Sequence, residues 1–362
     1  MFAGLQGNPG ATQADAVAAA RQSDHVYALA VQIQKYGAAM RQANPGVQLY
    51  VYVNGELSQS SDCSKFPASW YLYGKGGVKV KSATTGNCAM YALSTRTWNG
   101  YAGWADYVAH LCKQQLAAAP LANGCFVDQI SSALDSGFAT TLPIDPATGA
   151  LYKAATWMSQ MGMIGARVQS FAGKPVIGNS YEGGSRYWGV PTNIVNRYAI
   201  NGFESEHFLN AQSSQWTQLS RWTQNINMMI DGQAHGKAVH VGFTDAPAST
   251  EETWRQYVVA SYLMGNNGNA WLAFCASTKH SYSDPSTLYK LQIGSPLQTA
   301  SSVSGYAIRP GVFVRHFTSG VAVVNLSGGT TTISLGAGYV DAGGRSVTSV
   351  ALANGRGMVL AK

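Results

Sequence analysis

Short apolar runs alternate with longer segments of helical periodicity along the first three quarters of the chain. The runs have the length and composition of strands buried on both faces, and the segments between them can form crossover helices. One such helix is expected through residues 152–171. The run at 25–31 is ambiguous, because it could also begin the helix that follows it. The expected strands are 2–6, 25–31, 47–56, 124–130, 174–182, 202–208, 237–245 and 270–276.

This succession predicts parallel βαβ units, and eight of them match the size of a (β/α)8 TIM barrel. We therefore expect such a barrel over residues 1–277. A doubly wound open sheet is the rival fold, but it usually has fewer strands. No G-x-G-x-x-G motif follows the first expected strand, so dinucleotide binding lacks its usual sequence signal.

The pattern changes after residue 277, where helical periodicity stops. Period-two runs separated by Gly-rich turns follow, as in 311–338. Such alternation is typical of antiparallel strands. The fold class expected for the whole chain is therefore α/β, with a TIM barrel followed by a small antiparallel, sandwich-like β domain over residues 278–362.

Charged residues make up only 11% of the chain, whereas Gly, Tyr and Trp are abundant. This composition is common in secreted proteins that act on polysaccharides. The net charge is +7, but the basic residues form no run of Lys or Arg, so we expect no nucleic-acid partner. An acidic glycan remains compatible with this charge. No apolar run approaches the roughly 18 residues that a membrane span requires, so we expect no membrane partner.

Five cysteines are present, and none of them forms a C-x-x-C pair. Cys63 and Cys88 lie in one long Gly-rich segment and could form a disulfide. Cys112 and Cys125 flank the expected junction of a helix and a strand, where we expect them to be small buried hydrophobes. One disulfide is consistent with export, and no leader is visible at Met1. We therefore expect a secreted or cell-surface protein whose leader is not part of this sequence.

Polar residues that end the expected strands are the main candidates for a functional site. The active site of a TIM barrel lies at the C-terminal ends of its strands. The chain has only six glutamates, and four of them fall at such ends. The polar residues at strand ends are Gln6, Asn8, Asn54, Glu56, Asp128, Asn179, Glu182, Glu204, Glu206 and Asp245.

Two of the expected strands share a pattern, since "NGCFVD" (123–128) and "NGFESE" (201–206) both run from Asn-Gly to an acid. Asn-Gly supplies the turn that begins each strand, so Asp128 and Glu206 should lie at equivalent heights. Strands four and six of a barrel are roughly 10 Å apart, so inward-leaning carboxylates would be about 5 to 9 Å apart. That range spans both retaining and inverting glycosidases, and we predict these two residues as the catalytic pair.

Structural alternatives exist for each of these acids. Asp128 could cap a loop, and Glu206 could pair with a cation such as Arg186 or Lys237. Glu204 lies one pleat deeper than Glu206, so we expect it to bind substrate, with the role of main acid as the alternative. For Asp245, substrate binding or tuning of a neighbouring pKa competes with loop capping.

Aromatic rings on the loops at the C-terminal ends of the barrel strands can stack on the apolar faces of sugars. We expect the loop aromatics to contribute such contacts, although each ring could equally pack in the core. His207 follows Glu206 directly and could touch substrate or be packed. The expected substrate-binding residues are Gln6, Asn54, Glu56, Trp70, Trp98, Tyr181, Glu182, Trp188, Glu204, His207 and Asp245.

Other catalytic schemes lack their sequence signals. No G-x-S-x-G nucleophile elbow and no H-E-x-x-H motif occur in the chain. We therefore expect no metal and no cofactor.

The quoted strands also resemble a known family. "ANGCFVDQI" (122–130) resembles the fourth strand of glycosyl-hydrolase-like TIM barrels, and "INGFESEHF" (200–208) resembles their sixth, with Glu206 in the acidic position. The stretch 291–327 resembles the end of their barrel and the start of a β domain. The layout of the site is similar to that of dextranase-type barrels, which are retaining. Two positions depart from the family's pattern, since Asn123 and Asn201 replace its Asp residues, and Glu204 is additional.

The resemblance implies a glycoside hydrolase that cleaves O-glycosyl bonds in a poly- or oligosaccharide, with retention of configuration. Two alternatives stay open: a non-catalytic carbohydrate-binding barrel, and a lyase or deacetylase that uses the same cleft. The sugar, the linkage and the oligomeric state are not specified by the sequence.

Overall fold

The computed structural model describes residues 1–58, 62–130, 139–181, 183–188, 200–211, 214–215, 217–246, 248–276 and 286–362. It describes only the backbone of residues 210–211, 214–215, 244–246, 248 and 275–276. The chain divides into two compact units. The N-terminal unit comprises residues 2–182 and 189–204, and the C-terminal unit comprises Met1 and residues 183–188 and 205–362.

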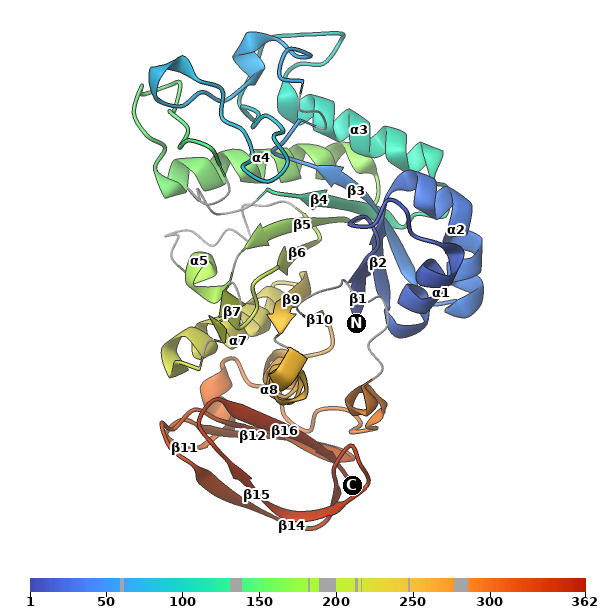
Figure 1. Cartoon of the computed structure of the whole chain (residues 1–362), viewed down its shortest axis with the longest axis vertical. Helices are drawn as coiled ribbons and strands as arrows, with labels where there is room; N and C mark the ends of the chain where they lie inside the picture. The colour runs from blue at the N-terminus through green and yellow to red at the C-terminus, as the bar shows by residue number, and fades with distance from the viewer. Residues whose placement is uncertain are drawn as a thin grey trace. The chain divides into compact units, whose positions relative to one another are not determined.

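The N-terminal unit is a succession of parallel strands and helices. Each strand from β1 to β4 pairs in parallel with the next one along the chain. The helices α3 and α4 pack side by side (Figure 1). The elements are β1 (Phe2–Gly4), α1 (Gln13–Gln22), β2 (His25–Ala28), α2 (Ala30–Ala43), β3 (Gln48–Asn54), α3 (Trp104–Ala118), β4 (Gly124–Asp128), α4 (Ala154–Ala172), β5 (Val176–Tyr181) and β6 (Gly202–Ser205).

The eight parallel strands confirm the predicted fold class. Their order in the sheet is β1-β2-β3-β4-β5-β6-β9-β10, which is also their order in the chain. A doubly wound sheet would reverse direction at a switch point, whereas a (β/α)8 barrel adds each strand beside the last. All eight predicted strands are present within or close to their expected bounds.

The ambiguous run at 25–31 is divided between two elements. β2 ends at Ala28, and α2 begins at Ala30. The Gln32 side chain accepts a 2.8 Å hydrogen bond from the Leu29 N–H, which satisfies one of the donors exposed at the helix start. Both readings of this run were therefore partly right.

Aromatic side chains fill the interior of the N-terminal unit. Tyr27 of β2 stacks on Phe126 of β4 with ring centroids 3.9 Å apart, and Tyr50 of β3 meets Tyr27 edge to face. Large rings bury more apolar area than aliphatic residues do, so few of them are needed to fill this space. Asp128 lies two residues after Phe126, so its side chain leaves the same face of β4.

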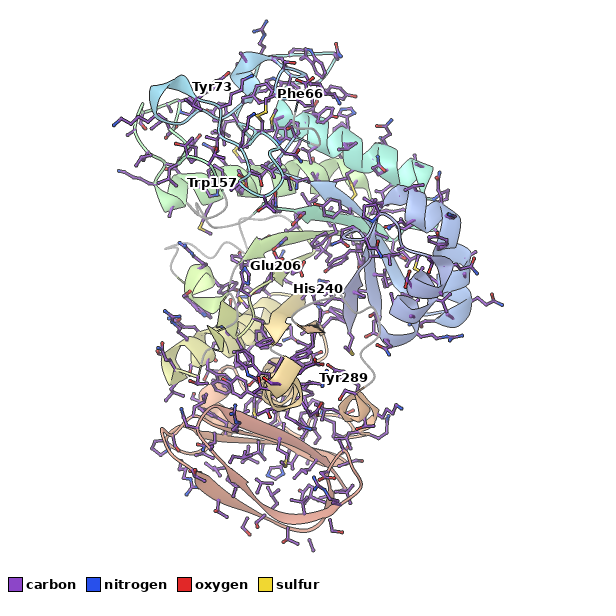
Figure 2. The ribbon with its side chains drawn as sticks, viewed as in Figure 1. Phe66, Tyr73, Trp157, Glu206, His240 and Tyr289 are labelled. Atoms are coloured by element: carbon purple, nitrogen blue, oxygen red, sulfur yellow. A yellow bond between two sulfur atoms is a disulfide. The ribbon has the colours of Figure 1, made fainter. Side chains whose placement is uncertain are left out.

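A long irregular segment (57–103) separates β3 from α3 and contains the short 3₁₀ turns η1 (Ala68–Trp70) and η2 (Lys75–Gly77). The disulfide Cys63–Cys88 crosses it, as the sequence suggested. Figure 2 labels Phe66 and Tyr73 of this segment. Phe66 lies in a cluster of aromatic rings with Trp70, Trp98, Trp104 and Tyr107.

The expectation for Cys112 and Cys125 was wrong. These residues are not two free thiols, because a disulfide joins them and ties α3 to β4. Their Cα atoms are 6.3 Å apart, within the range that a disulfide spans. Both side chains are buried, which is the only part of the prediction that holds.

The C-terminal unit contains the remaining helices and strands. Its six-stranded antiparallel sheet has the order β11-β12-β13-β16-β14-β15, and α8 packs against β13 and β16 (Figure 1). The predicted domain boundary at 277/278 falls outside the described residues and stays a prediction. The elements are α5 (Gly184–Trp188), β7 (Asn210–Ala211), β8 (Ser214–Gln215), α7 (Leu219–Ala234), β9 (Ala238–Ala246), η3 (Ala248–Thr250), α8 (Glu251–Gly265), β10 (Ala270–Ala276), η4 (Thr287–Lys290), η5 (Val303–Tyr306), β11 (Ala307–Arg309), β12 (Val312–Phe317), β13 (Gly320–Asn325), β14 (Thr331–Val340), β15 (Ser346–Leu352) and β16 (Arg356–Ala361).

A buried arginine joins this sheet to the end of α8. Arg315 of β12 has no exposed surface and donates hydrogen bonds to the backbone carbonyls of Leu263 and Asn266. The last carbonyls of a helix lack partners within the helix and carry partial negative charge, so a guanidinium suits this position. The C-terminal sheet is therefore fastened to the helix that precedes β10. Among the described residues, no helix combines the length and the apolar character needed to cross a membrane.

Candidate active site

Three donors surround the carboxylate of Asp128 at the end of β4. The Tyr52 hydroxyl donates to Oδ2 over 2.6 Å, the Asn179 side-chain amide donates to Oδ1 over 3.0 Å, and the Gln129 N–H donates to Oδ1 over 2.8 Å. They come from β3, β5 and the residue that follows β4. Hydrogen bonds of this kind stabilise the ionised form of a carboxyl group and fix its orientation. Asp128 is half-buried, so it is not an ordinary surface charge.

The backbone that follows Asp128 is held in an uncommon conformation. Gln129 has a φ of 55°, in the left-handed region that most non-glycine residues avoid. Its side-chain oxygen accepts a 3.0 Å hydrogen bond from Asn54 at the end of β3. The Asn54 side chain also accepts the N–H groups of Glu56 and Leu57, so it forms the turn that leaves β3. Asn54, which we expected to bind substrate, is thus engaged in shaping the ends of β3 and β4.

Glu56 lies close to Asp128 and is only 7% exposed. Burial, followed by the negative charge of Asp128, raises the pKa of the Glu56 carboxyl to about 8. A carboxyl group with a raised pKa therefore lies next to the hydrogen-bonded carboxyl group of Asp128. Strongly perturbed pKa values are characteristic of functional sites. Glu56 is not the exposed sugar contact that the sequence suggested.

Glu204 is buried within β6, whereas Glu206 is exposed in the turn of residues 206–209 that follows the strand. The pKa of Tyr27 is raised well above its usual value by burial and, second, by the negative charge of Glu204. Glu204 therefore faces the aromatic interior of the N-terminal unit. Glu206 is labelled in Figure 2.

The repeated Asn-Gly pattern has a structural basis. The Asn123 side chain accepts the Leu49 N–H over 2.9 Å, and its own N–H donates to the Leu49 carbonyl over 2.6 Å. Asn201 repeats both bonds with Val176, over 3.0 and 2.9 Å. Each asparagine therefore fixes its strand in the same register against the preceding strand. Glu206 is five residues after Asn201, as Asp128 is five residues after Asn123.

Among the aromatic candidates, Trp70 was wrongly predicted to bind substrate. It has no exposed surface, packs against Phe66 and Trp98, and donates its indole N–H to the Arg96 carbonyl. A ring without an exposed face cannot stack on a sugar, so Trp70 is a core residue of the 57–103 segment. A loop aromatic that packs on other aromatics has the same sequence pattern as one that lines a cleft.

The other three aromatic candidates differ in exposure. Trp98 is half-buried in the cluster of Trp70. Tyr181 is 1% exposed and meets Phe203 edge to face. Trp188, at the end of α5, is 43% exposed, and its indole N–H donates to the Gln224 carbonyl. Only Trp188 has a broadly exposed ring.

Two polar candidates have a buried atom without a hydrogen bond. Within the described part of the chain, this holds for Oε1 of Gln6, after β1, and for Nδ1 of His207, after Glu206. A buried polar atom without a partner is costly unless water or a ligand satisfies it. Glu182 and the Asp245 side chain lie outside the described residues. No cluster of three or more His, Cys, Asp and Glu residues that could hold a metal ion is found in the described part of the chain.

Tyr52 was not among the residues that the sequence suggested, and Asn179 was noted at the end of its strand but given no role. Tyr52 is two residues before Asn54 on the same face of β3, and Phe126 is its register partner on β4. Asn179 follows Gly178, which pairs with Val127. Both residues share a face with a predicted candidate, and that period-two relationship was the signal available in the sequence.

The family of the chain is shown by a match to a family model. The model of the hypothetical glycosyl hydrolase family 15 matches residues 39–321, which is more than half of the chain. The matched region begins in α2 and ends in β13, so it includes Asp128, Glu204 and Glu206. The protein belongs to this family of glycosyl hydrolases. No curated protein matches the sequence.

One similar solved structure supports the fold, and a second one is less similar. A noncanonic maltogenic α-amylase, AmyB from Thermotoga neapolitana, is 9% identical with a TM-score of 0.53, and the comparison covers 100% of this chain and 97% of the other. An α-amylase from Geobacillus thermoleovorans is 7% identical with a TM-score of 0.47, over 99% and 95% of the two chains. At such low sequence identity, the similarity to AmyB shows the fold alone. The TM-score of the second structure is too low to support any conclusion.

Proposed function

We propose that the protein hydrolyses O-glycosyl bonds in a poly- or oligosaccharide, with Asp128 and Glu206 as its two catalytic carboxyl groups and with retention of configuration. Asp128 attacks the anomeric carbon while Glu206 protonates the departing glycosidic oxygen. Glu206 then takes a proton from water, which attacks the same carbon and releases the Asp128 carboxylate. The family supports glycoside hydrolysis, and the assignment of the two residues is our own.

The hydrogen-bonded carboxylate of Asp128 is the observation that carries this proposal. A nucleophile of this kind must be ionised, correctly oriented and located at the C-terminal end of a barrel strand. Both carboxylate oxygens of Asp128 accept hydrogen bonds. Asp128 is also the last residue of β4. The assignment of Glu206 rests on the repeated pattern: Asn201 bonds to the preceding strand as Asn123 does, and Glu206 lies five residues after Asn201 as Asp128 lies five residues after Asn123.

The remaining polar candidates are proposed as substrate ligands. The unsatisfied atoms of Gln6 and His207 suit sugar hydroxyl groups, which both donate and accept hydrogen bonds. Glu182, Glu204 and Asp245 are proposed for the same role from their positions in the sequence. Trp188 offers an exposed ring that a sugar face could cover.

We also propose that the protein is exported. Two disulfides, Cys63–Cys88 and Cys112–Cys125, lie in the N-terminal unit. Disulfides persist in oxidising compartments and are rare in the cytosol of most organisms. Fractionation of the native host, followed by detection of the protein outside the cytoplasm, tests this proposal, and a cytoplasmic protein with free thiols would contradict it.

The test of function is the digestion of a panel of neutral and acidic glycans by the wild type, Asp128→Asn, Glu206→Gln and Glu252→Gln. Glu252 lies on α8 outside the proposed site, so its variant controls for the loss of one acid. We expect release of sugars that both site variants lower by about 10³-fold or more, and a control close to the wild type. Retained binding without cleavage by any of the proteins would instead indicate a non-catalytic carbohydrate-binding barrel. Unsaturated products would indicate a lyase.

A further inference from the structure

A closed ring of hydrogen bonds joins the two carboxylate oxygens of Asp128. The Gln129 N–H donates to Oδ1 of Asp128, and the Gln129 side-chain oxygen accepts from Asn54 over 3.0 Å. The Asn54 amide nitrogen also donates to the Tyr52 hydroxyl over 3.4 Å, and that hydroxyl donates to Oδ2 of Asp128. The ring holds the Gln129 side chain beside the group that attacks the sugar in the proposed reaction.

The orientation of the Gln129 amide follows from that of its partner. Oδ1 of Asn54 accepts the backbone N–H groups of Glu56 and Leu57, which can only donate. The amide nitrogen of Asn54 therefore faces Gln129, and Gln129 must present its oxygen to that nitrogen. Within the described ranges, no protein group accepts a hydrogen bond from the Gln129 side-chain nitrogen, Nε2. Because Gln129 is only half-buried, this donor is open to a ligand.

The backbone of Gln129 favours a smaller residue than glutamine. Its φ of 55° lies in the left-handed region, which glycine adopts without the strain that a side chain causes. A glycine would also keep the N–H that donates to Asp128. The glutamine side chain therefore adds only its bond to Asn54 and the donor at Nε2. Strain that is kept at a functional site points to a use for the side chain that causes it.

The Asp128 carboxylate has little capacity left to bind a sugar hydroxyl group. An ionised carboxylate offers about four acceptor positions, two on each oxygen. Oδ1 accepts from Gln129 and Asn179, and Oδ2 accepts from Tyr52. The remaining position on Oδ2 has to face the anomeric carbon that Asp128 attacks. A hydroxyl group on the neighbouring carbon therefore needs a partner from another residue.

We propose that the side-chain amide of Gln129 donates a hydrogen bond to the 2-hydroxyl group of the sugar that Asp128 attacks. This inference rests on the proposed function of Asp128. The 2-hydroxyl is carried by the carbon next to the anomeric carbon, so it is the hydroxyl group nearest to the attacking carboxylate. Hydrogen bonds to it strengthen in the transition state of glycoside cleavage. Gln129 is then a specificity-determining residue that favours sugars with a free 2-hydroxyl over 2-deoxy sugars.

The test uses a substrate found in a panel of 4-nitrophenyl α- and β-glycosides, together with its 2-deoxy counterpart. The measured quantity is the ratio of kcat/KM for the 2-hydroxy substrate to kcat/KM for the 2-deoxy substrate. Comparing this ratio between proteins cancels the different intrinsic reactivity of the two substrates. Gln129→Gly removes the donor and relieves the backbone, whereas Gln129→Met removes the donor and keeps the length of the side chain.

We expect both variants to lower this ratio by about 5- to 10-fold, which corresponds to the loss of one neutral hydrogen bond. Gln34→Met is the matched control and should keep the wild-type ratio, because Gln34 is an exposed residue of α2. An unchanged ratio in Gln129→Gly would overturn the inference even if both kcat/KM values fell, since Gln129 would then act only through Asp128. Full activity of Asp128→Asn would overturn the proposed function instead, and a wild type that cleaves no glycoside would overturn both.

Discussion

The Tyr52 hydroxyl donates a 2.6 Å hydrogen bond to Oδ2 of Asp128, across the two neighbouring strands β3 and β4. The backbone partner of Tyr52 is Phe126, so the tyrosine reaches along the strand to the residue one pleat further on. A phenol in this place supplies a donor without a positive charge. It stabilises the Asp128 carboxylate and fixes its plane, while its ring continues the aromatic interior below.

This bond predicts the effect of Tyr52→Phe. The substitution keeps the ring and removes the donor, and a hydrogen bond to a charged group contributes about 1.5 to 3 kcal/mol. We expect kcat to fall by about 10- to 100-fold, with KM changed less. Tyr73→Phe is the matched control, because the Tyr73 hydroxyl donates to a backbone carbonyl in the 57–103 segment. Equal kinetics for Tyr52→Phe and the wild type would show that the bond has no role in the reaction.

The paired bonds of Asn201 predict a difference between two substitutions. Asn201→Ala leaves the Val176 N–H without its acceptor. The free energy of unfolding, measured with urea, should therefore fall by about 1 to 3 kcal/mol. Asn201→Asp keeps an oxygen in the same place, so its free energy of unfolding should fall by less than half as much. If Asp is as destabilising as Ala, the side-chain oxygen does not fix the register of β6.

The pKa of Glu56 predicts a pH-dependent gain of stability in Glu56→Gln. The folded-state pKa is raised from 4.5 to about 8, so the unfolded chain releases this proton first. Relative to the glutamine variant, the wild type should lose stability progressively between about pH 4.5 and 8 and reach a deficit of up to about 4 kcal/mol. Urea unfolding of both proteins at pH 4, 6 and 8.5 measures this difference. A difference that is constant across this range would contradict the raised pKa.

The close approach at Gly55 predicts that Gly55→Ala is destabilising and impairs activity. Its Cβ would overlap Ile130 and press on the Asp128 carbonyl, and overpacking of this kind costs about 1 to 3 kcal/mol. Gly329→Ala is a suitable control, since no atom lies within 4 Å of a Cβ there. Thermal unfolding compares the two variants, and an unchanged Tm for Gly55→Ala would show that the end of β3 can move away from β4.

The fold was predictable because each strand is a separate apolar run, and apolar periodicity depends on residues close together in the sequence. The position of Asp128 at the end of β4 was predictable for a similar reason, since it ends such a run. The disulfide between Cys112 and Cys125 was not, because its formation depends on how α3 packs on β4. Trp70 was misjudged for the same kind of reason, as burial of a loop aromatic is decided by its neighbours in space. Tyr52 resembles an ordinary core residue, and only the structure shows its hydroxyl at Asp128.

Azide rescue tests the central claim most directly, on any glycoside with a good leaving group that the wild type cleaves. Small azide ions can replace a missing carboxylate at the anomeric carbon. With Asp128→Gly, azide should restore turnover and give a glycosyl azide of the opposite anomeric configuration to the substrate. With Glu206→Ala, the glycosyl azide should have the same configuration as the substrate, because Asp128 still forms the covalent intermediate. Exchanged configurations, or no rescue of either variant, would contradict the assignment of Asp128 as nucleophile and Glu206 as acid and base.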